Sequence, residues 1–496
     1  MEKLLIGGAD HEQLAWQLGK LSNRHGLITG ATGSGKTVTL QVLAEGFARM
    51  GVPVFATDVK GDLAGLGAAG KPHAEIDRRV ELLNLTDYEQ APCSVTLWDV
   101  FGKNGHPVRV TISEMGPMIL ASLLRLNDVQ TGVLYAAFSI ADDQGLLLLD
   151  LKDLRSLLTW MNDNSKDLRG TYGNLSGASI GAIQRKLLAL KSQGGARLFG
   201  EPALKFADLV RQDSQGHGVV NLLSGAKLMR DAPRVYAAFL MWLLSELFEE
   251  LPEVGDPDRP KLVLFFDEAH LLFSNMPTEV LDRLEQVVRL IRSKGVGVYF
   301  VTQNAQDLPD DILGQLGLRV AHVMRAYTAK ERKAVKLAAE NFRNDHNLPV
   351  AEMVTQLGVG EALVSALDAK GRPGNVQHAV IVPPASRIGP LRPAERLDLI
   401  EGSGMSGQYD QAIDRRSAYE MLSERAELAA QKELESRHEE PEPVRRRQSA
   451  APKRRSRGRG RQRQSIAEAM FKSAARSVGR SIGTKLVRGL LGSLLK

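Results

Sequence analysis

Cysteine is almost absent from this sequence, which has only Cys93 among its 496 residues. A single cysteine excludes any disulfide bond within the chain and indicates a reducing compartment. Long apolar runs are also missing, since the longest, 235–248, is interrupted by Ser245 and Glu246 and is too short to cross a bilayer. The first residues lack the apolar core of a signal peptide. We therefore expect a cytoplasmic protein, whether free or attached peripherally to a membrane or to the nucleoid.

Acidic residues are scarce at the C-terminal end of the sequence. Residues 445–496 contain 16 lysines and arginines but a single acidic residue, Glu468, so this segment carries +15. Because the whole chain carries +6, residues 1–444 carry −9. The body of the protein is thus mildly acidic, and any nucleic-acid surface on it must be local.

Residues 30–37 fit the pattern G-x-x-x-x-G-K-[ST] of a phosphate-binding loop. The eight residues are Gly30, Ala31, Thr32, Gly33, Ser34, Gly35, Lys36 and Thr37. Residues 25–29 predict a short buried strand before the loop, and 38–47 predict a helix after it, which is the context that this loop requires. Glycines let successive N–H groups turn towards an anion, and the helix N-terminus adds its positive dipole end. We expect the loop to bind ATP, with Lys36 at the β- and γ-phosphates and the Thr37 hydroxyl on Mg²⁺.

A second motif begins at Lys261, where an apolar run leads into Asp267 and Glu268. This is the Walker B pattern, in which a buried strand holds two carboxylates at the sheet edge that faces the phosphate loop. Asp267 would then bind Mg²⁺ through water, and Glu268 would act as the general base on the attacking water.

Two further strands are predicted to end in polar residues at the same edge. Asp58 follows the apolar segment 52–57, and a parallel strand ends where ligands bind in open α/β sheets. Asp58 is therefore a candidate nucleotide-binding residue, with a solvated turn as the alternative. Thr302 and Gln303 follow the segment 295–301, and either would lie beside the γ-phosphate as a sensor of hydrolysis, with a strand-end cap as the alternative.

The order of the predicted elements indicates an α/β fold with a mostly parallel sheet. Its core comprises residues 1–71, with one short strand at 3–6, and residues 216–382. Between them, 72–215 loses the strand–helix alternation and is predicted to be a mostly helical insertion, in which 95–98 and 108–112 form a strand pair. A Pro/Gly-rich linker (383–411), a charged helix (412–444) and a basic disordered segment (445–464) follow.

Residues 465–496 are predicted to form a basic amphipathic helix. Apolar residues recur every four positions from Ile466 to Leu494, and five lysines and arginines are interleaved with them. Such a helix suits an anionic membrane surface or the groove of a protein partner.

Four blocks of the sequence, 23–37, 58–63, 266–272 and 293–298, resemble bacterial HerA-like helicase C-terminal domain proteins of the YjgR type. The resemblance covers essentially the whole chain. It implies a RecA-like (ASCE) P-loop NTPase of the HerA–FtsK superfamily, whose ring-forming ATPases pump nucleic acid or protein. HerA itself carries an N-terminal β-barrel, and residues 1–24 are too short for one.

The resemblance also implies roles for individual residues. Lys36 and Thr37 would bind ATP and Mg²⁺, Asp267 and Glu268 would form the Walker B pair, and Gln303 would match the polar sensor of the superfamily. In a hexameric ring, Arg292 would complete catalysis from its position ahead of the sensor strand, with Arg289 and Arg319 as alternatives.

We therefore interpret the chain first as an ATP-hydrolysing motor, a hexameric DNA translocase or helicase. A nucleotide-switched scaffold anchored by its basic tail is a second interpretation, and a protein-remodelling or secretion ATPase is a third. A small-molecule kinase is disfavoured because the Asp-Glu pair suits the activation of water. Stimulation of ATP hydrolysis by DNA would separate the first interpretation from the others.

Overall fold

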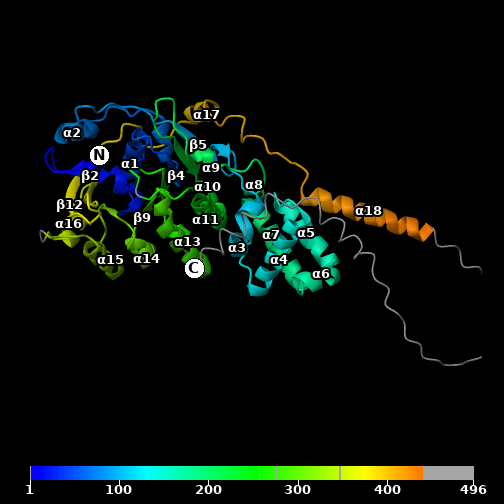
Figure 1. Cartoon of the computed structure of the whole chain (residues 1–496). Coiled ribbons are helices and arrows are strands. Elements are labelled where there is room, and N and C mark those ends of the chain that lie inside the picture. The colour runs from blue at the N-terminus through cyan, green and yellow to red at the C-terminus, as the bar shows by residue number, and fades with distance from the viewer. Residues whose placement is uncertain (1, 256, 274–277, 346–347, 439–496) are drawn as a thin grey trace, which may run out of the picture.

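A single large sheet organises the computed structural model, which describes residues 2–255, 257–273, 278–345 and 348–438 (Figure 1). Its strands are β1 (Lys3–Gly8), β2 (Leu14–Leu18), β3 (Gly26–Thr29), β4 (Val54–Asp58), β5 (Val95–Asp99), β6 (His106–Pro107), β7 (Val220–Ser224), β8 (Leu262–Phe266), β9 (Val296–Thr302), β10 (Leu318–Ala321), β11 (Glu361–Ser365) and β12 (Gln377–Ile381). They lie in the order β2-β1-β12-β11-β10-β3-β9-β8-β4-β7-β5-β6.

The two halves of the sheet differ in strand direction. From β10 to β6 all neighbours are parallel, whereas β2, β1, β12, β11 and β10 pair antiparallel. Strand β9 lies between β3, which precedes the phosphate loop, and β8, which carries the Walker B motif. The predicted α/β fold with a mostly parallel sheet is confirmed.

Helices cover both faces of the sheet. They are α1 (Lys36–Arg49), α2 (Ala74–Leu82), α10 (Ala226–Asp231), α11 (Pro233–Glu250), α12 (His270–Phe273), α13 (Thr278–Ile291), α14 (Asp310–Leu313), α15 (Ala329–Glu340) and α16 (Val350–Gln356). Alternate residues of a strand face opposite ways. In β8, Val263 and Phe265 pack with Phe47 of α1, whereas Leu264 and Phe266 pack in the core that includes α11 and α13. The strand is therefore buried on both faces, as its continuous apolar run predicts.

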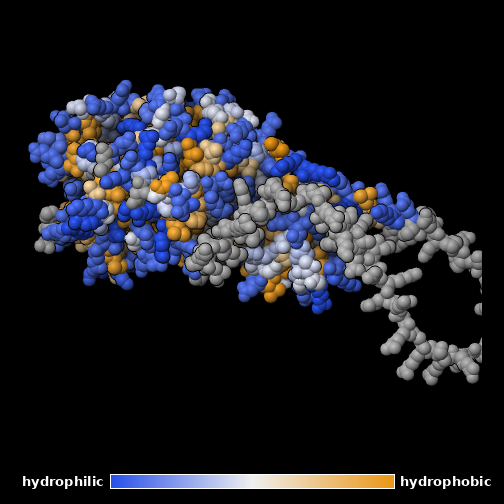
Figure 2. All heavy atoms as spheres, in the orientation of Figure 1, coloured by the Kyte–Doolittle hydropathy of each residue, from blue (hydrophilic) through white to orange (hydrophobic). Residues whose placement is uncertain are grey.

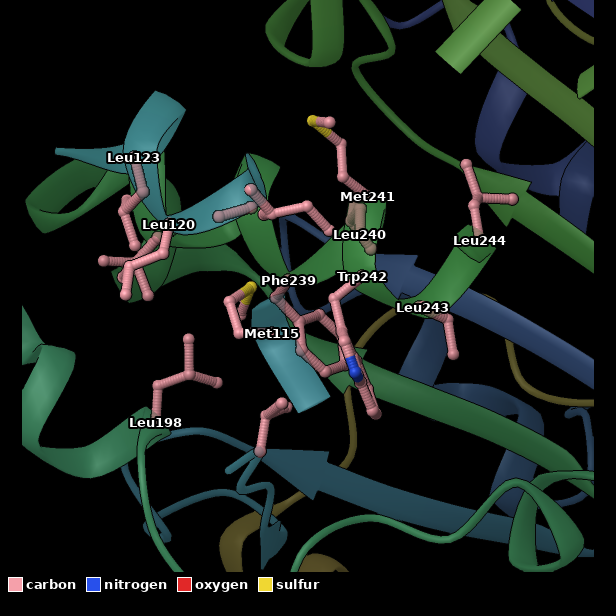
Figure 3. Close-up of a cluster of buried hydrophobic side chains, with 14 of the residues drawn as sticks. Met115, Leu120, Leu123, Leu198, Phe239, Leu240, Met241, Trp242, Leu243 and Leu244 are labelled. Carbon is pink, nitrogen blue, oxygen red and sulfur yellow. The ribbon is translucent and has the colours of Figure 1, made fainter. Parts of the chain in front are cut away.

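A helical region extends from one side of the sheet (Figure 1). It comprises α3 (Ile112–Leu123), α4 (Asp128–Gln144), α5 (Leu151–Asp163), α6 (Ser165–Tyr172) and α7 (Gly177–Leu190). The short helices α8 (Ala196–Leu198) and α9 (Phe206–Leu209) follow, and α9 lies on the body beside β5 (Figure 1). Figure 3 shows how the helical region joins the core, with Met115 and Leu120 of α3 beside Phe239 of α11. These helices lie within the predicted insertion 72–215, and strand β5 of the same range belongs to the main sheet.

Two predictions about strands are wrong. Residues 95–98 do form a strand, but β5 pairs with β7 and β6 of the main sheet rather than with 108–112. The second segment forms no strand, because Thr111 and Glu114 make a capping box that starts helix α3 at Ile112. Residues 1–24 hold a hairpin of two strands, β1 and β2, where one short strand was predicted.

The predicted linker 383–411 packs against the body, and with residues 412–417 it forms a strap. The buried Glu45 carboxylate accepts hydrogen bonds from the N–H groups of Ala385 and Ser386, both at 2.9 Å. Further along, His106 bonds through its two ring nitrogens to Asp410 and Ser403, each at 2.8 Å. The strap also contains helix α17 (Pro393–Glu401). These bonds explain why a Pro/Gly-rich sequence follows the surface here instead of leaving it.

Helix α18 (Ala418–His438) begins on α5 and then projects from the body (Figures 1 and 2). The Ala418 N–H donates to the Leu147 carbonyl at 3.0 Å, and Lys152 pairs with Asp414 and Glu420 at 2.7 and 3.1 Å. Beyond this first turn the helix is largely hydrophilic (Figure 2). The predicted segments 445–464 and 465–496 lie outside the described residues. In the described part of the chain, every helix is too short or too polar to cross a membrane.

Candidate phosphate-binding and catalytic site

The phosphate loop joins β3 to α1, and its backbone requires glycine at specific positions. Gly30, Gly33 and Gly35 have φ of 146°, 80° and 113°, conformations that L side chains rarely adopt. A Cβ on Gly30 would also lie 2.6 Å from the Cβ of His322. Gly35 directly precedes α1, so the N-terminus of that helix faces the loop. The loop therefore has the geometry that places backbone N–H groups around an anion.

Residues far along the chain hold the loop in place. The Ala31 N–H donates to the Val323 carbonyl at 2.8 Å, and the Gly360 N–H donates to the Ser34 carbonyl at 3.0 Å. His322 is fully buried, donates from Nδ1 to the Glu361 carbonyl, and accepts the Thr39 hydroxyl at Nε2, both at 2.8 Å. Burial lowers the pKa of His322 to about 4, so this ring is neutral at pH 7.

Lys36 extends from the first turn of α1 back over the loop. Its ammonium donates to the carbonyls of Gly30 and Ala31 at 2.7 and 3.0 Å, and the side chain is buried. Burial lowers the pKa of Lys36, while the nearby Glu268 carboxylate acts in the opposite direction. Lys36 is therefore a desolvated cation beside the loop, as the motif predicts. Thr37 follows it, half-buried, in the same turn.

Asp267 and Glu268 lie at the end of β8, on the edge of the sheet where β3 meets the phosphate loop. The Asp267 N–H donates to the Thr57 hydroxyl at 3.1 Å, which ties the tip of β8 to that of β4. The Glu268 N–H donates to Asp267 Oδ1 at 2.9 Å. Burial and then the Glu268 charge raise the pKa of Asp267 to about 6. The two acids are thus held together in a dry setting that disfavours two uncompensated negative charges.

Glu268 has an unusual conformation. Its φ is 49°, which is in the left-handed region that non-glycine residues rarely occupy. Its Oε1 lies 3.5 Å from Lys60 Nζ, and its Oε2 lies 3.5 Å from His270 Nδ1. Oε2 is buried and has no hydrogen-bond partner among the described residues. One carboxylate oxygen is therefore left with accepting capacity inside the site.

The Asp58 carboxylate is hydrogen-bonded to the turn that follows it. It accepts the N–H of Gly61 at 2.7 Å and that of Ala64 at 3.2 Å. It is buried, and burial raises its pKa. These contacts make Asp58 the anchor of the loop that carries Lys60, and its part in nucleotide binding stays a prediction.

Of the other predicted residues, Gln303 lies at the same edge of the sheet as the two acids, whereas Arg292 does not. Gln303 follows β9 and is exposed, whereas the preceding Thr302 is buried and donates to Asp307 at 2.6 Å. Arg292 lies in the short 3-10 helix η4 (Arg292–Lys294), ahead of β9, and the seven residues of that strand span roughly 20 Å. Arg292 is thus at the opposite end of β9 from Gln303.

The alternative arginines are bound to other groups of the protein. The Arg319 guanidinium donates to the carbonyls of Asn341 and Leu313 at 2.8 and 3.1 Å. Arg289 lies 3.9 Å from Asp311. The catalytic roles of Gln303 and Arg292 stay predictions.

A cavity of about 440 Å³ opens beside the phosphate loop. Loop residues 31–34, residues 323–327 after β10, and Thr355 and Val359 line it. Arg325 and Tyr327 on its wall are exposed, Tyr327 by 81%. The cavity thus offers an aromatic ring and a cation next to the phosphate-binding backbone.

Sequence reasoning missed Lys60 and His322 at this site. Lys60 stands between Asp58 and Asp62 in a block that was identified, but its contact with Glu268 joins positions far apart in the chain. His322 directly follows an apolar strand, and this position at a strand end was the one feature of the sequence that could have placed it at the site.

Comparisons with known proteins agree with this geometry. Residues 3–496 match the family described as Helicase HerA-like C-terminal. The chain is 23% identical over 350 residues to the DNA double-strand break repair helicase HerA of Saccharolobus solfataricus, and 24% identical over 316 residues to the DNA import protein CedB of Sulfolobus acidocaldarius. These matches cover 69% and 62% of this chain, but 61% and 45% of the relatives.

The fold resembles that of a bacterial conjugative coupling protein, TrwBdeltaN70. Its unbound monoclinic form has a TM-score of 0.51 and is 16% identical, and the match covers 78% of this chain and 90% of the coupling protein. Its trigonal form in complex with sulphate has a TM-score of 0.50 at 15% identity, with 78% and 98% covered. The chain therefore belongs to the HerA-like helicase C-terminal family and shares its α/β fold with this coupling protein.

Proposed function

We propose that this protein hydrolyses ATP and uses the energy as a hexameric motor on DNA. The observation that supports hydrolysis best is the Walker B pair. A buried Glu268 oxygen, which has no hydrogen-bond partner within the described part of the chain, belongs to the same site as the Lys36 ammonium. A kinase would need a site for an acceptor molecule, whereas a carboxylate with accepting capacity suits the activation of water.

The phosphate loop would bind ATP through its backbone N–H groups. Lys36 would exchange the carbonyls of Gly30 and Ala31 for β- and γ-phosphate oxygens. The cavity that Arg325 and Tyr327 flank would receive the adenine ring, because it adjoins the loop and presents an aromatic surface for stacking.

The Thr37 hydroxyl and the Asp267 carboxylate are oxygen donors of the kind that Mg²⁺ binds, and these two residues would hold it. The raised pKa of Asp267 fits this assignment, because a nearby cation would favour the ionised carboxylate. When bound, Mg²⁺ would neutralise charge on the β- and γ-phosphates.

Glu268 would then accept a proton from the attacking water. The water oxygen bonds to the γ-phosphorus as the bond to the β-phosphate oxygen breaks, and ADP and phosphate result. Gln303 would sense this change from the tip of β9.

DNA is the proposed substrate because the two relatives described above are a DNA import protein and a helicase of DNA double-strand break repair. The experiment compares the ATPase rate of the full chain without DNA, with single-stranded DNA and with double-stranded DNA, alongside a mass measurement. The Lys36→Ala variant, purified in the same way, controls for contaminating ATPases. We expect DNA to stimulate hydrolysis and the mass to be that of a hexamer.

A rate that neither form of DNA changes would contradict the DNA motor. It would favour the secretion ATPase or the nucleotide-switched scaffold, in which the basic tail binds an anionic membrane or a protein partner.

A further inference from the structure

Lys60 is a second lysine at the Walker B acids, and neither motif includes it. Its Nζ lies 3.5 Å from Glu268 Oε1. The two side chains differ in exposure, because Lys60 is 42% exposed and Glu268 is 11% exposed. The pair therefore joins a solvent-accessible cation to a carboxylate that is largely withdrawn from water.

The loop that carries Lys60 is fixed independently of this ion pair. The Asp58 carboxylate accepts the N–H groups of Gly61 and Ala64, which flank the turn after Lys60. The Asp58 carbonyl accepts the Gly225 N–H at 2.8 Å, which ties the same turn to the end of β7. Lys60 thus approaches Glu268 from a backbone that three hydrogen bonds hold in place.

The position of the Glu268 carboxylate depends on its contacts with neighbouring side chains. The Glu268 backbone has φ of 49°, so the carboxylate is set by an uncommon conformation rather than by a regular strand or helix. Oε2 has no hydrogen-bond partner among the described residues, although His270 Nδ1 lies 3.5 Å from it, the same distance as that between Lys60 Nζ and Oε1. Of the two oxygens, Oε1 therefore faces the lysine, and Oε2 faces the histidine ring and keeps a lone pair that can accept a proton.

We infer that Lys60 is a positioning residue, which holds Glu268 by Oε1 so that Oε2 faces the attacking water. This role rests on the proposed hydrolysis of ATP. Lys36 and the loop N–H groups already provide contacts for the phosphates, so Lys60 is not required for nucleotide binding. A general base that is misplaced by about 1 Å can lose on the order of 10²-fold in rate.

An exposed ion pair is the alternative interpretation, and such pairs usually contribute little to stability. The two interpretations differ in a measurable way. A surface pair would leave catalysis unchanged when it is removed, whereas a positioning lysine would lower kcat and leave nucleotide affinity unchanged.

The experiment compares the full chain with Lys60→Met, Lys60→Gln and Lys60→Arg in steady-state ATP hydrolysis. Lys103→Met, which removes an exposed lysine elsewhere, is the matched control. We expect the two neutral variants to lose about 10- to 100-fold in kcat with little change in KM or in the Kd of a fluorescent ATP analogue. Lys60→Arg should recover much of the rate, because a guanidinium can reach Oε1. Thermal midpoints identify any variant that has lost its fold.

A double-mutant cycle tests whether Lys60 acts through Glu268. In single-turnover measurements, Lys60→Met should cost little in the Glu268→Gln background, because the base is already gone. The same loss in both backgrounds would overturn the inference, as would an unchanged or increased kcat in an active wild-type protein. An inactive wild-type protein would overturn the proposed hydrolysis, and this inference with it.

Discussion

At the residue scale, Lys36 and Glu268 carry opposite charges in the same buried site, but their proposed roles differ: Lys36 binds phosphate, and Glu268 activates water. Lys36 donates to the carbonyls of Gly30 and Ala31, the position from which it would contact phosphates before the reaction begins. Glu268 keeps Oε2 without a hydrogen-bond partner among the described residues, and a base is needed only as the water is activated. An interaction made only in the transition state affects the rate and not the binding of substrate.

Lys36→Ala is therefore expected to weaken ATP binding, and Glu268→Gln to leave binding largely intact while hydrolysis stops. The loss of a general base typically costs about 10²–10⁴-fold in rate. A fluorescent ATP analogue measures binding, and phosphate release measures turnover. Turnover near that of the wild type in Glu268→Gln would remove Glu268 from the proposed role.

The sequence predicted the residues of this site where the signal is local. Lys36 and Thr37 follow a glycine pattern within eight positions, and Asp267 and Glu268 follow one apolar strand. Lys60 and His322 could not be assigned in this way, because their partners come from other strands. The contacts of Asp58 are local, but a carboxylate before a turn gives no sign of whether it binds a ligand or the turn itself.

At the scale of elements, His25 joins three segments at the end of the sheet opposite to the phosphate loop. It lies before β3, donates from Nε2 to the Val288 carbonyl of α13 at 2.8 Å, and accepts the Val298 N–H of β9 at Nδ1 at 3.0 Å. These bonds use the neutral ring, and a proton on Nδ1 would remove one of them. Burial first, and then the charge of Arg292, lower the pKa of His25 to about 4.

This lowered pKa makes stability depend on pH in a defined direction. Between about pH 6.5 and pH 4 the unfolded His25 binds a proton and the folded one does not, so stability falls as the pH falls through this window. The contribution is on the order of 3 kcal/mol. His25→Gln, whose amide can donate and accept hydrogen bonds, should flatten the dependence of the thermal midpoint on pH between 4 and 6.5. The part of this dependence that comes from the buried His322 should remain.

The exposed His11→Gln is the matched control and should leave that dependence unchanged. If His25→Gln and His11→Gln have the same pH profile, burial of His25 does not determine acid stability.

The prediction of elements succeeded where strand and helix alternate and failed where they do not. In the core, each strand that is buried on both faces has a continuous apolar run, so β3, β4, β8 and β9 were visible in the sequence. Residues 95–98 also form a strand, but the sequence favoured a neighbour close in the chain. Strand β5 does pair over two residues with the nearby β6, but its longer pairing is with β7, which follows after the whole helical region. A pairing over that distance leaves no local pattern.

At the scale of the whole molecule, the position of Arg292 bears on assembly. It lies ahead of β9, roughly 20 Å of strand away from the end that carries Gln303. An arginine in this place cannot reach the Walker acids of its own chain. In a ring, each subunit uses two different faces, so a residue remote from its own site can meet the site of a neighbour. We propose that Arg292 acts in this way, and the bonds of Arg319 to backbone carbonyls make that residue a structural one.

We expect Arg292→Ala to lower the rate of hydrolysis. Arg319→Ala should lower the thermal midpoint, because it removes the bonds to the backbone carbonyls. Arginines supplied to a neighbouring site contribute roughly 10³–10⁵-fold to the rate in well-studied NTPases. The wild-type rate per subunit should also rise with protein concentration as rings form.

Mixing separates a shared site from a site within one chain. Lys36→Ala has an intact arginine and a defective loop, and Arg292→Ala has the reverse. In mixed rings, some interfaces pair an intact loop with an intact arginine, so the mixture should hydrolyse ATP faster than either variant alone. Lys36→Ala mixed with Glu268→Gln is the matched control, because both changes affect the same face and no interface becomes complete. No gain in the first mixture, or a rate per subunit that is independent of concentration in a demonstrable monomer, would contradict the shared site, and Arg292 would then have no catalytic role in either subunit.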